Sequence, residues 1–284
     1  MEDCKRTVKR KKNKTEKQED VIKSKIKSEE ESKKPIDLKY GPLPTFTNQR
    51  IWSRAILILG ASVVVYFTSK SNKEISFAKQ RDLIESRQHN VICSEDYKSE
   101  LDKFPGCVPE ICGRYVTDKL ITETEANELL EVAKKAFSLS VSEGGASIVD
   151  LHSGALSMGK VFVNIYKLES GADLFSAADF FTYKSVRTKI QNLVSQHFKI
   201  SPNSLFLTHP TFFSRLTSKD AVTPHDEYWH PHVDKETYKS FHFTSLLYLN
   251  DFGLDFNGGR FVFIEKNNNT LVIEPKKGRV STFT

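Results

Sequence analysis

The N-terminal part of this 284-residue sequence lacks the residues that build a hydrophobic core. Residues 5–34 contain no aromatic side chain and very few large apolar ones. Such a segment cannot bury enough apolar surface to offset the entropy lost on ordering, so residues 1–50 are predicted to be a disordered tail. The tail holds 15 Lys or Arg and 9 Asp or Glu, an excess that equals the formal net charge of +6 of the whole chain. Residues 51–284 therefore carry no net charge, and nothing in their charge favours nucleic-acid binding.

Long apolar runs are also scarce, and one stands out: residues 51–68, with the sequence IWSRAILILGASVVVYFT. Its length is close to the roughly 20 residues that cross a bilayer, and Arg54 near its start can reach the lipid headgroups. Trp52 and Tyr66 lie near opposite ends, where amphipathic rings favour the membrane interface. Because basic residues dominate on its N-terminal side, the positive-inside rule predicts a cytosolic N-terminus. We therefore expect a single-pass type II signal anchor of the secretory pathway, in the endoplasmic reticulum, with the C-terminal domain luminal.

Other interpretations of these two segments remain open. The basic run at residues 9–12 could act as a nuclear-localisation signal or a nucleic-acid-binding arm. Residues 51–68 could instead form a buried core helix. A membrane anchor explains the basic tail and the apolar run together, so we favour it.

Cysteine is rare as well. The four residues are Cys4, Cys93, Cys107 and Cys112. In an oxidising lumen we expect a local disulfide among the last three, for example between Cys107 and Cys112, although an odd number leaves the pairing open. The same topology places the sequon at Asn268 in the lumen and predicts a glycoprotein, whereas the sequon at Asn13 would face the cytosol.

The chain after the anchor divides by composition. Residues 69–103 are polar with scattered apolar residues, which indicates a stalk, and residues 104–284 are predicted to form the folded domain. In that domain a capping-box spacing begins at Thr122, and apolar residues recur at helical spacing to about Ser138. A second helix is predicted over residues 177–198.

From residue 204 onward the pattern changes to short runs of β-branched and aromatic residues separated by Gly, Asn and Pro. The strands predicted there are 205–207, 211–216, 241–249, 260–264 and 270–273, and an earlier one spans 161–166. Two helices followed by short, evenly spaced strands predict an α+β fold in which helices pack on a β-sandwich or jelly roll. Three arginines, Arg215, Arg260 and Arg279, are expected to be solvated charges at strand ends.

The residues with the clearest chemistry lie in the C-terminal third of the chain. His232 and Asp234 are two residues apart, so on an extended segment their side chains project to the same side and can bind one metal ion. His225 and Glu227 have the same spacing, which by itself does not choose between the two pairs. His232 and Asp234 are favoured because a predicted strand, a Gly-Gly turn and a Pro-x-x-Gly turn follow them in order.

The order of these motifs resembles the prolyl-4-hydroxylase-like branch of the iron(II)/2-oxoglutarate dioxygenases. The matching residues are Trp229-His230-Pro231-His232-Val233-Asp234, Thr244-Ser245-Leu246-Leu247-Tyr248-Leu249-Asn250, Gly258-Gly259 and Pro275-Lys276-Lys277-Gly278. The resemblance covers about residues 204–284 and implies a double-stranded β-helix (jelly roll) with iron at its mouth. It implies that His232 and Asp234 are two ligands of a facial triad, that Tyr248 contacts 2-oxoglutarate and that ascorbate is the reductant. The implied activity is hydroxylation of a protein or small molecule that the sequence does not identify.

The resemblance is incomplete at its C-terminal end. In the family the third metal ligand is a His beyond the position of Phe283, followed by an Arg or Lys that binds the distal carboxylate of 2-oxoglutarate. Neither residue is in this sequence, and the last strands would be missing too. We therefore expect a C-terminally truncated chain that is inactive as a dioxygenase. The alternatives are a non-catalytic luminal jelly-roll binding module with a degenerate metal site, and a non-functional truncated product.

Overall fold

The computed structural model describes residues 47–284, except for residues 70–72, 102, 105, 107–108, 142, 172, 209–210, 224–229, 238, 240 and 266–268. Most of the predicted tail, Cys107 and the sequons at Asn13 and Asn268 therefore lie outside the described residues. The chain divides into two compact units, Met1–Ser71 and Asn72–Thr284. The disorder expected of the tail stays a prediction.

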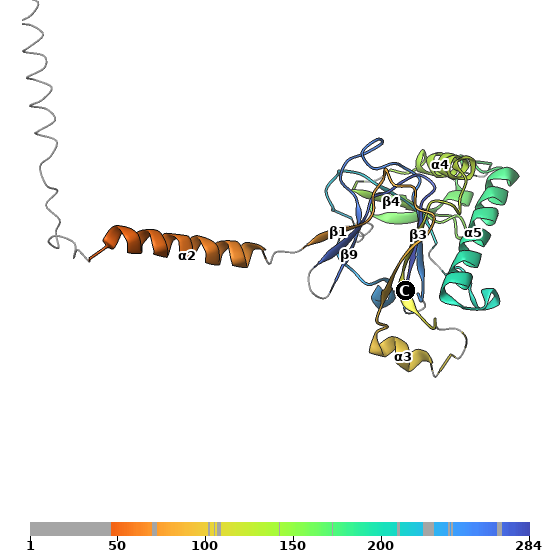
Figure 1. Cartoon of the computed structure of the whole chain (residues 1–284). Helices are drawn as coiled ribbons and strands as arrows, with labels where there is room; N and C mark the ends of the chain where they lie inside the picture. The colour runs from red at the N-terminus through yellow and green to blue at the C-terminus, as the bar shows by residue number, and fades with distance from the viewer. Residues whose placement is uncertain are drawn as a thin grey trace, which may run out of the picture. The chain divides into compact units, whose positions relative to one another are not determined.

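The described residues of the first unit contain a helix, α2, which spans Gln49–Ser69 (Figure 1). Its residues Gln49–Thr68 are long and apolar enough to cross a membrane. Large apolar side chains are exposed along this helix, whereas a core helix of a soluble protein would bury them. Its basic residues, Arg50 and Arg54, lie in the first two turns. In the described part of the first unit, this segment is thus an exposed apolar helix of membrane-spanning length.

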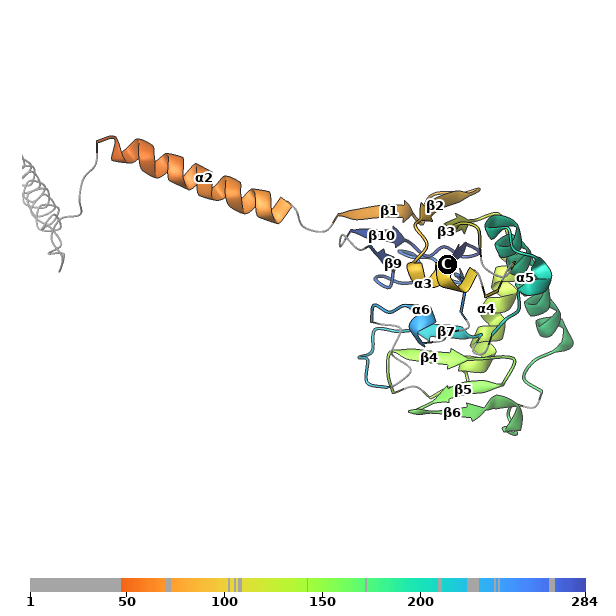
Figure 2. The same ribbon diagram turned by 90° about the horizontal axis from the view of Figure 1, so that it is seen from below.

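The second unit combines helices with three sheets among its described residues, so its fold is α+β. The strand orders are β1-β10-β9, β2-β3-β11-β8 and β6-β5-β4-β7. The strands are β1 Glu74–Ala78, β2 Arg87–Val91, β3 Cys112–Thr117, β4 Ala146–Val149, β5 Ala155–Met158, β6 Val161–Asn164, β7 Phe213–Leu216, β8 Thr244–Leu247, β9 Phe261–Ile264, β10 Thr270–Ile273 and β11 Val280–Phe283. The pairing of β1 with β10 is parallel, and the other pairs within these sheets are antiparallel. In Figure 2 the third sheet lies at the bottom of the unit and the other two lie at the top.

The first two sheets pack against each other through a shared apolar core. Phe77 and Leu271 come from the first sheet and Val116 from the second, and all three are buried. Tyr248 and Phe263 pack against this cluster while staying partly exposed. The side of β8 that carries Tyr248 therefore faces the space between the two sheets.

Both predicted helices are confirmed, as α4, Glu123–Phe137, and α5, Ala177–Phe198. Each begins with a capping box, at Thr122 and Ser176, in which a side chain and a backbone amide exchange hydrogen bonds across the first turn. The two helices lie side by side (Figures 1 and 2). Short 3₁₀ turns also occur, η1 at Ile165–Lys167 and η2 at Pro202–Ser204.

Two further apolar clusters fix α4 and α5 on the sheets. Val186 of α5 packs with Val280 of β11 in a cluster that also contains residues of α4. Phe137, at the end of α4, packs with Val149 of β4 in the other cluster. The helices therefore connect the second sheet, which contains β8 and β11, with the third.

Four predicted strands are present with shorter bounds, as β6, β7, β8 and β9, and β10 has the predicted bounds. Residues 205–207 do not form the predicted strand. The side-chain amide of Gln191 in α5 donates hydrogen bonds to the carbonyls of Pro202 and Leu205 at 2.9 and 2.7 Å. This segment therefore satisfies its backbone carbonyls on a helix instead of a neighbouring strand.

The strands β1 and β2 lie in the segment that the sequence predicts to be a stalk. Both are paired with strands of the predicted folded domain, β1 with β10 and β2 with β3. Between β2 and β3 lies α3, Glu95–Leu101, in a segment that is closed by a disulfide between Cys93 and Cys112. A local disulfide among the three cysteines is therefore confirmed, with Cys93 in place of Cys107 as the partner of Cys112. Val91 is the ladder partner of Cys112, which brings Cys93 close to Cys112 as well.

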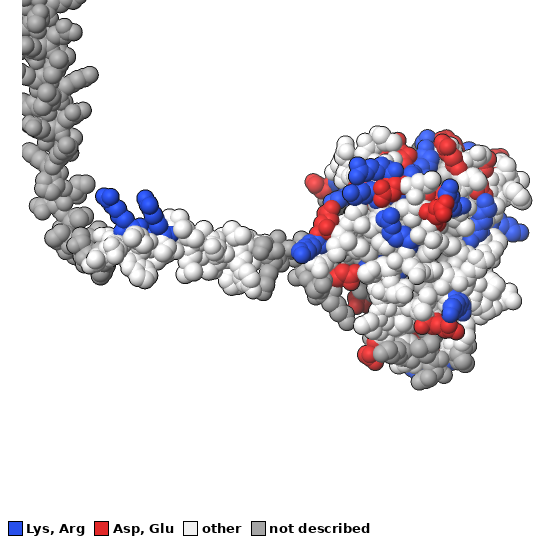
Figure 3. Space-filling model, viewed as in Figure 1, with Lys and Arg blue, Asp and Glu red and all other residues white. Residues whose placement is uncertain are grey.

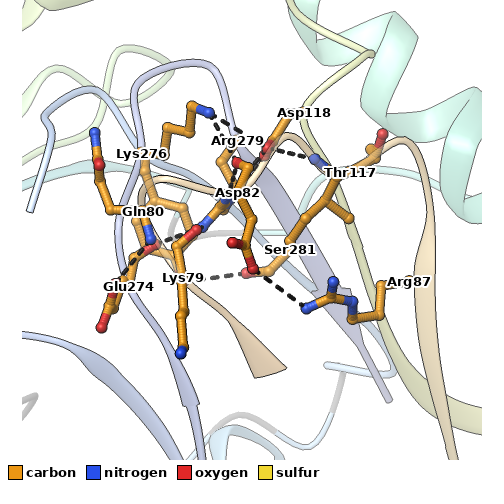
Figure 4. Close-up of polar contacts among 12 residues, drawn as sticks. Lys79, Gln80, Asp82, Arg87, Thr117, Asp118, Glu274, Lys276, Arg279 and Ser281 are labelled. Atoms are coloured by element: carbon orange, nitrogen blue, oxygen red, sulfur yellow. Dashed lines mark hydrogen bonds and ion pairs between the residues drawn. The ribbon is translucent and has the colours of Figure 1, made fainter. Parts of the chain in front are cut away.

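Arg279 connects the N-terminal strands to the end of the chain in a buried polar network (Figure 4). Its Nε and Nη2 atoms donate to the two carboxylate oxygens of Asp118 at 2.7 and 2.9 Å. Its remaining N–H groups donate to the carbonyls of Lys79, Glu274 and Asp82. The expectation that Arg279 is solvated is wrong, because its carboxylate partner lies 161 residues away in the sequence and no local pattern signals it.

The two glycine-containing turns of the motif are tight turns with positive φ. The φ angles are 76° at Gly258, 60° at Gly259 and 81° at Gly278, a region that residues with a Cβ rarely adopt. The turn at Gly278 leads from β10 into β11, and its N–H donates to the carbonyl of Tyr248 at 2.9 Å. It therefore helps to hold the chain just after β8.

Candidate metal centre

His232 and Asp234 converge in the structure. Nε2 of His232 lies 3.2 Å from Oδ1 of Asp234, and the two side chains are 29% and 26% exposed. Asp234 is the first residue of α6, Asp234–Thr237, so the chain becomes helical here instead of staying extended. The two polar atoms nonetheless face each other at a position that solvent can reach. We call this pair the metal clamp.

Two hydrogen bonds orient the metal clamp. The hydroxyl of Thr244, at the start of β8, donates to Oδ2 of Asp234 at 2.6 Å. This bond leaves Oδ1 directed at the imidazole. Nδ1 of His232 lies 2.8 Å from the carbonyl oxygen of His230, which fixes the orientation of the ring.

The arrangement fits a cation between the two side chains. A carbonyl oxygen only accepts hydrogen bonds, so Nδ1 of His232 carries a proton, and Nε2 presents a lone pair whenever it carries none. That lone pair faces a carboxylate oxygen of Asp234, so a proton or a metal ion must lie between them to avoid repulsion. Imidazole nitrogen and carboxylate oxygen are both ligands of Fe(II) in facial-triad sites. The two residues present therefore fit iron.

The described part of the chain contains no group of three or more His, Cys, Asp and Glu side chains that could hold a metal. The competing pair, His225 and Glu227, lies outside the described residues. His242 is described, and its Nε2 lies 3.1 Å from Oε2 of Glu100. Among the described residues, no third His, Cys, Asp or Glu therefore completes a metal site with His232 and Asp234.

Tyr248 follows β8 and lies on the same side of the chain as Thr244, because side chains alternate along an extended chain and the two residues are four positions apart. Four extended residues span about 13 Å. Its N–H donates to the carbonyl of Arg279 at 3.0 Å, which continues the ladder between β8 and β11. Its hydroxyl lies 3.2 Å from Oγ of Ser281. Burial raises the pKa of Tyr248, opposed by the hydrogen bond with Ser281 and the charge of Arg279. The hydroxyl is therefore protonated at neutral pH and able to donate to a carboxylate.

Glu100 of α3 lies beside the metal clamp and was not indicated by any sequence pattern. Its Oε2 accepts a hydrogen bond from Nζ of Lys235 at 2.6 Å. The two residues are 135 positions apart in the sequence. The hydrogen bond from Lys235 lowers the pKa of Glu100, while burial raises it by less, so the carboxylate is charged at neutral pH. Thr244 was also given no role, although the alternation along β8 places it on the side of Tyr248 and so offers a signal.

The surface of the second unit carries charges of both signs. On the face shown in Figure 3, basic and acidic side chains are interspersed. This distribution agrees with the zero net charge of residues 51–284.

The curated proteins that this chain resembles share one name. A "2-oxoglutarate and iron-dependent oxygenase domain-containing protein 3" from Xenopus tropicalis is 51% identical over 241 residues, which are 82% of this chain and 75% of that protein. The protein of the same name from Rattus norvegicus is 49% identical over 245 residues, 83% of this chain and 77% of that protein. The human one is 53% identical over 209 residues, 73% of this chain and 65% of that protein. No family model matches the chain, and no solved structure matches it.

Identity of this degree, over three-quarters of the Xenopus relative, places the chain in the class of oxygenase domain proteins. Within that class it belongs to the family of 2-oxoglutarate and iron-dependent oxygenase domain-containing protein 3.

Proposed function

We propose that the chain belongs to a membrane-anchored dioxygenase that depends on Fe(II) and 2-oxoglutarate and hydroxylates a substrate of unknown identity, a protein or a small molecule. We further propose that these 284 residues by themselves, with two of the three implied metal ligands, are inactive as a dioxygenase. His232 and Asp234 would hold the iron, and Tyr248 would bind a carboxylate of 2-oxoglutarate. The observation that carries this proposal is the 3.2 Å approach of Nε2 of His232 to Oδ1 of Asp234, in a chain about half identical to oxygenase domain proteins. Bound iron would supply the activation of dioxygen, with ascorbate as the reductant.

The chain's own residues prepare the site for these tasks. Thr244 holds Asp234 with one oxygen free to bind, and the carbonyl of His230 keeps the proton of His232 on Nδ1, so that Nε2 is the ligand atom. Tyr248 keeps its hydroxyl proton because desolvation raises the pKa of that hydroxyl. It can therefore donate a hydrogen bond to an anionic co-substrate without repelling it.

We also propose that the two packed sheets belong to a double-stranded β-helix. Supporting this, β1-β10-β9 and β2-β3-β11-β8 share one apolar core, and Tyr248 lies on the inner side of β8. A jelly roll places the co-substrate between its two sheets, which is the side of β8 that Thr244 and Tyr248 occupy.

For the topology, we propose a type II signal anchor at residues 51–68 with the second unit in the lumen of the endoplasmic reticulum. Arg50 and Arg54, together with the basic tail, favour a cytosolic N-terminus. The disulfide between Cys93 and Cys112 favours an oxidising compartment. In intact microsomes, added protease should leave the second unit undigested, and its complete digestion would contradict this orientation.

The function is tested with the full-length protein in lipid nanodiscs under anaerobic conditions. We expect it to bind Fe(II) and 2-oxoglutarate in calorimetry. Because only two of the three implied ligands are present, we expect no conversion of 2-oxoglutarate to succinate once oxygen is admitted. His232→Ala should abolish the binding of both, because it removes a ligand. His230→Ala should retain the binding of both, because His230 contacts His232 through its backbone carbonyl, which the substitution keeps. Tyr248→Phe should retain Fe(II) binding and weaken 2-oxoglutarate binding.

A wild-type protein that binds neither Fe(II) nor 2-oxoglutarate would overturn the proposal. The alternative, a non-catalytic jelly-roll binding module with a degenerate metal site, would then hold. Equal loss in the His230→Ala variant would show that the effect of His232→Ala is not specific to its imidazole.

A further inference from the structure

The segment that the disulfide closes, Cys93 to Cys112, contacts two stretches of chain near the metal clamp, at Lys235 and at His242. Its helix α3 contributes Tyr97 and Glu100, which are three residues apart and therefore lie on one side of the helix. Glu100 accepts from Lys235, the residue immediately after Asp234. Side chains far apart in the sequence thus meet beside the proposed ligand Asp234.

One carboxylate oxygen of Glu100 joins two points of the chain. Oε2 lies 2.6 Å from Nζ of Lys235 and 3.1 Å from Nε2 of His242. Lys235 is adjacent to Asp234, and His242 lies two residues before Thr244. The hydrogen bond from Thr244 to Asp234 therefore joins the same two stretches of chain that Glu100 joins. We call the contacts of Glu100 with Lys235 and His242 the outer bridge. It connects the same stretches of chain as the hydrogen bond from Thr244 that orients Asp234.

Tyr97 keeps this outer bridge in place. Its side chain is 6% exposed, and its hydroxyl donates to the carbonyl of His242 at 3.2 Å. Nζ of Lys235 lies 5.0 Å from the centre of the Tyr97 ring, within the range of a cation–π contact. Helix α3 thus contacts both Lys235 and His242 through two side chains each.

The burial of these groups decides how much the bridge matters. An exposed ion pair contributes about 0–1 kcal/mol and does little to fix geometry. The side chains of Lys235, Glu100 and His242 are only 26%, 27% and 29% exposed. Charge-assisted hydrogen bonds at such partly buried positions are stronger than exposed ones and more directional.

We infer that Glu100 is a positioning residue for the metal clamp. It holds Lys235 and His242 together so that Thr244 stays within hydrogen-bond reach of Asp234 and the carboxylate keeps Oδ1 directed at His232. The identity of the bound metal rests on the proposed function, whereas the positioning of the two side chains does not. The disulfide between Cys93 and Cys112 contributes by closing the segment that carries α3.

The first test measures metal affinity with the full-length protein in nanodiscs, using Mn(II), which is stable in air and detectable by electron paramagnetic resonance. Glu100→Gln should raise the Kd for Mn(II) about threefold to tenfold, somewhat below the about 10–100-fold effect of losing a group that hydrogen-bonds a ligand directly. Glu100→Asp, which keeps the charge, should recover part of the loss. Glu110→Gln is the matched control, because Glu110 lies in the same disulfide-closed segment but pairs with Lys199.

The second test needs no metal. In hydrogen–deuterium exchange of the metal-free protein, peptides covering residues 230–235 and 241–247 should exchange faster in Glu100→Gln than in wild type. They should be unchanged in Glu110→Gln, and the midpoint of urea unfolding should be the same in both variants.

The outcomes separate the two proposals. If wild type binds no Mn(II) and yet Glu100→Gln still accelerates exchange, the proposed function fails and the positioning role is supported. If Glu100→Gln changes neither the exchange nor the Kd relative to Glu110→Gln, the positioning role is overturned whatever metal the protein binds. A lower unfolding midpoint with an unchanged Kd would also overturn it, since Glu100 would then only stabilise the fold.

Discussion

Two polar networks of the second unit, one around Arg279 and one around His232, differ in how far they are removed from water. The side chains of Arg279 and Asp118 are 0% and 5% exposed, whereas those of His232 and Asp234 are 29% and 26% exposed. Arg279 uses all five N–H donors of its guanidinium on protein acceptors. In the metal clamp, by contrast, a ring nitrogen and a carboxylate oxygen face each other 3.2 Å apart at a partly exposed position.

This difference separates a structural ion pair from a site that can take a ligand. A buried charge whose hydrogen bonds are all made has no capacity left for an outside group, and its cost of desolvation is repaid by its protein partners. A partly exposed acid held by one hydrogen bond, as Asp234 is by Thr244, keeps an oxygen for a metal. Sequence spacing distinguishes neither case, because Asp118 and Arg279 lie 161 residues apart and the spacing of His232 and Asp234 recurs at His225 and Glu227.

The largest expected effect comes from breaking the buried network. Asp118→Asn should lower the free energy of unfolding by about 3–5 kcal/mol, because Arg279 would keep its charge without a buried counter-charge. Urea denaturation followed by circular dichroism measures this loss. Arg260→Gln is the control, since the pair of Arg260 with Glu74 is far more exposed, and it should change the unfolding midpoint very little. Equal effects of the two variants would remove the distinction between buried and exposed pairs.

A smaller effect, confined to ligand binding, is expected from Thr244. Thr244→Val keeps the shape of the side chain and removes its hydroxyl, so Asp234 loses the hydrogen bond to Oδ2. We expect the Kd for Fe(II) or Mn(II) to rise about 10–100-fold, which calorimetry can measure. Thr244→Ser keeps the hydroxyl and should bind the metal nearly as well as wild type. If Thr244→Val binds the metal like wild type, the hydrogen bond does not prepare the metal clamp.

Local patterns predicted the helices well. The capping-box spacing at Thr122 and the apolar spacing within both segments depend only on neighbouring residues, and α4 and α5 lie where these patterns place them. The strand β10 was also predicted with its observed bounds, because its apolar residues lie between polar turns.

Features that depend on distant residues could not be predicted. The strand β1 is short and half exposed, and only its pairing with β10, almost 200 residues later, makes it part of a sheet. Arg279 was expected in solvent because its local sequence is a turn, and Asp118 gives no sign of being its partner. The pairing of Cys93 with Cys112 likewise follows from the β2–β3 ladder, not from the spacing of cysteines.

For the candidate site, the sequence motif indicated His232, Asp234 and Tyr248. It did not indicate the residues whose hydrogen bonds support them, Thr244 and Glu100. The convergence of His232 and Asp234 agrees with their two-residue spacing, and their roles as metal ligands stay a prediction, as does the role of Tyr248. Glu100 could not be found from the sequence, since it belongs to a segment interpreted as a stalk.

The most direct measurement is a crystal structure of the full-length protein with Fe(II) and 2-oxoglutarate present. Anomalous scattering at the iron edge then locates the metal. The account predicts an iron ion bonded to Nε2 of His232 and Oδ1 of Asp234, with the hydroxyl of Thr244 on Oδ2. Iron bound elsewhere, or these two side chains turned apart with saturating iron present, would contradict it.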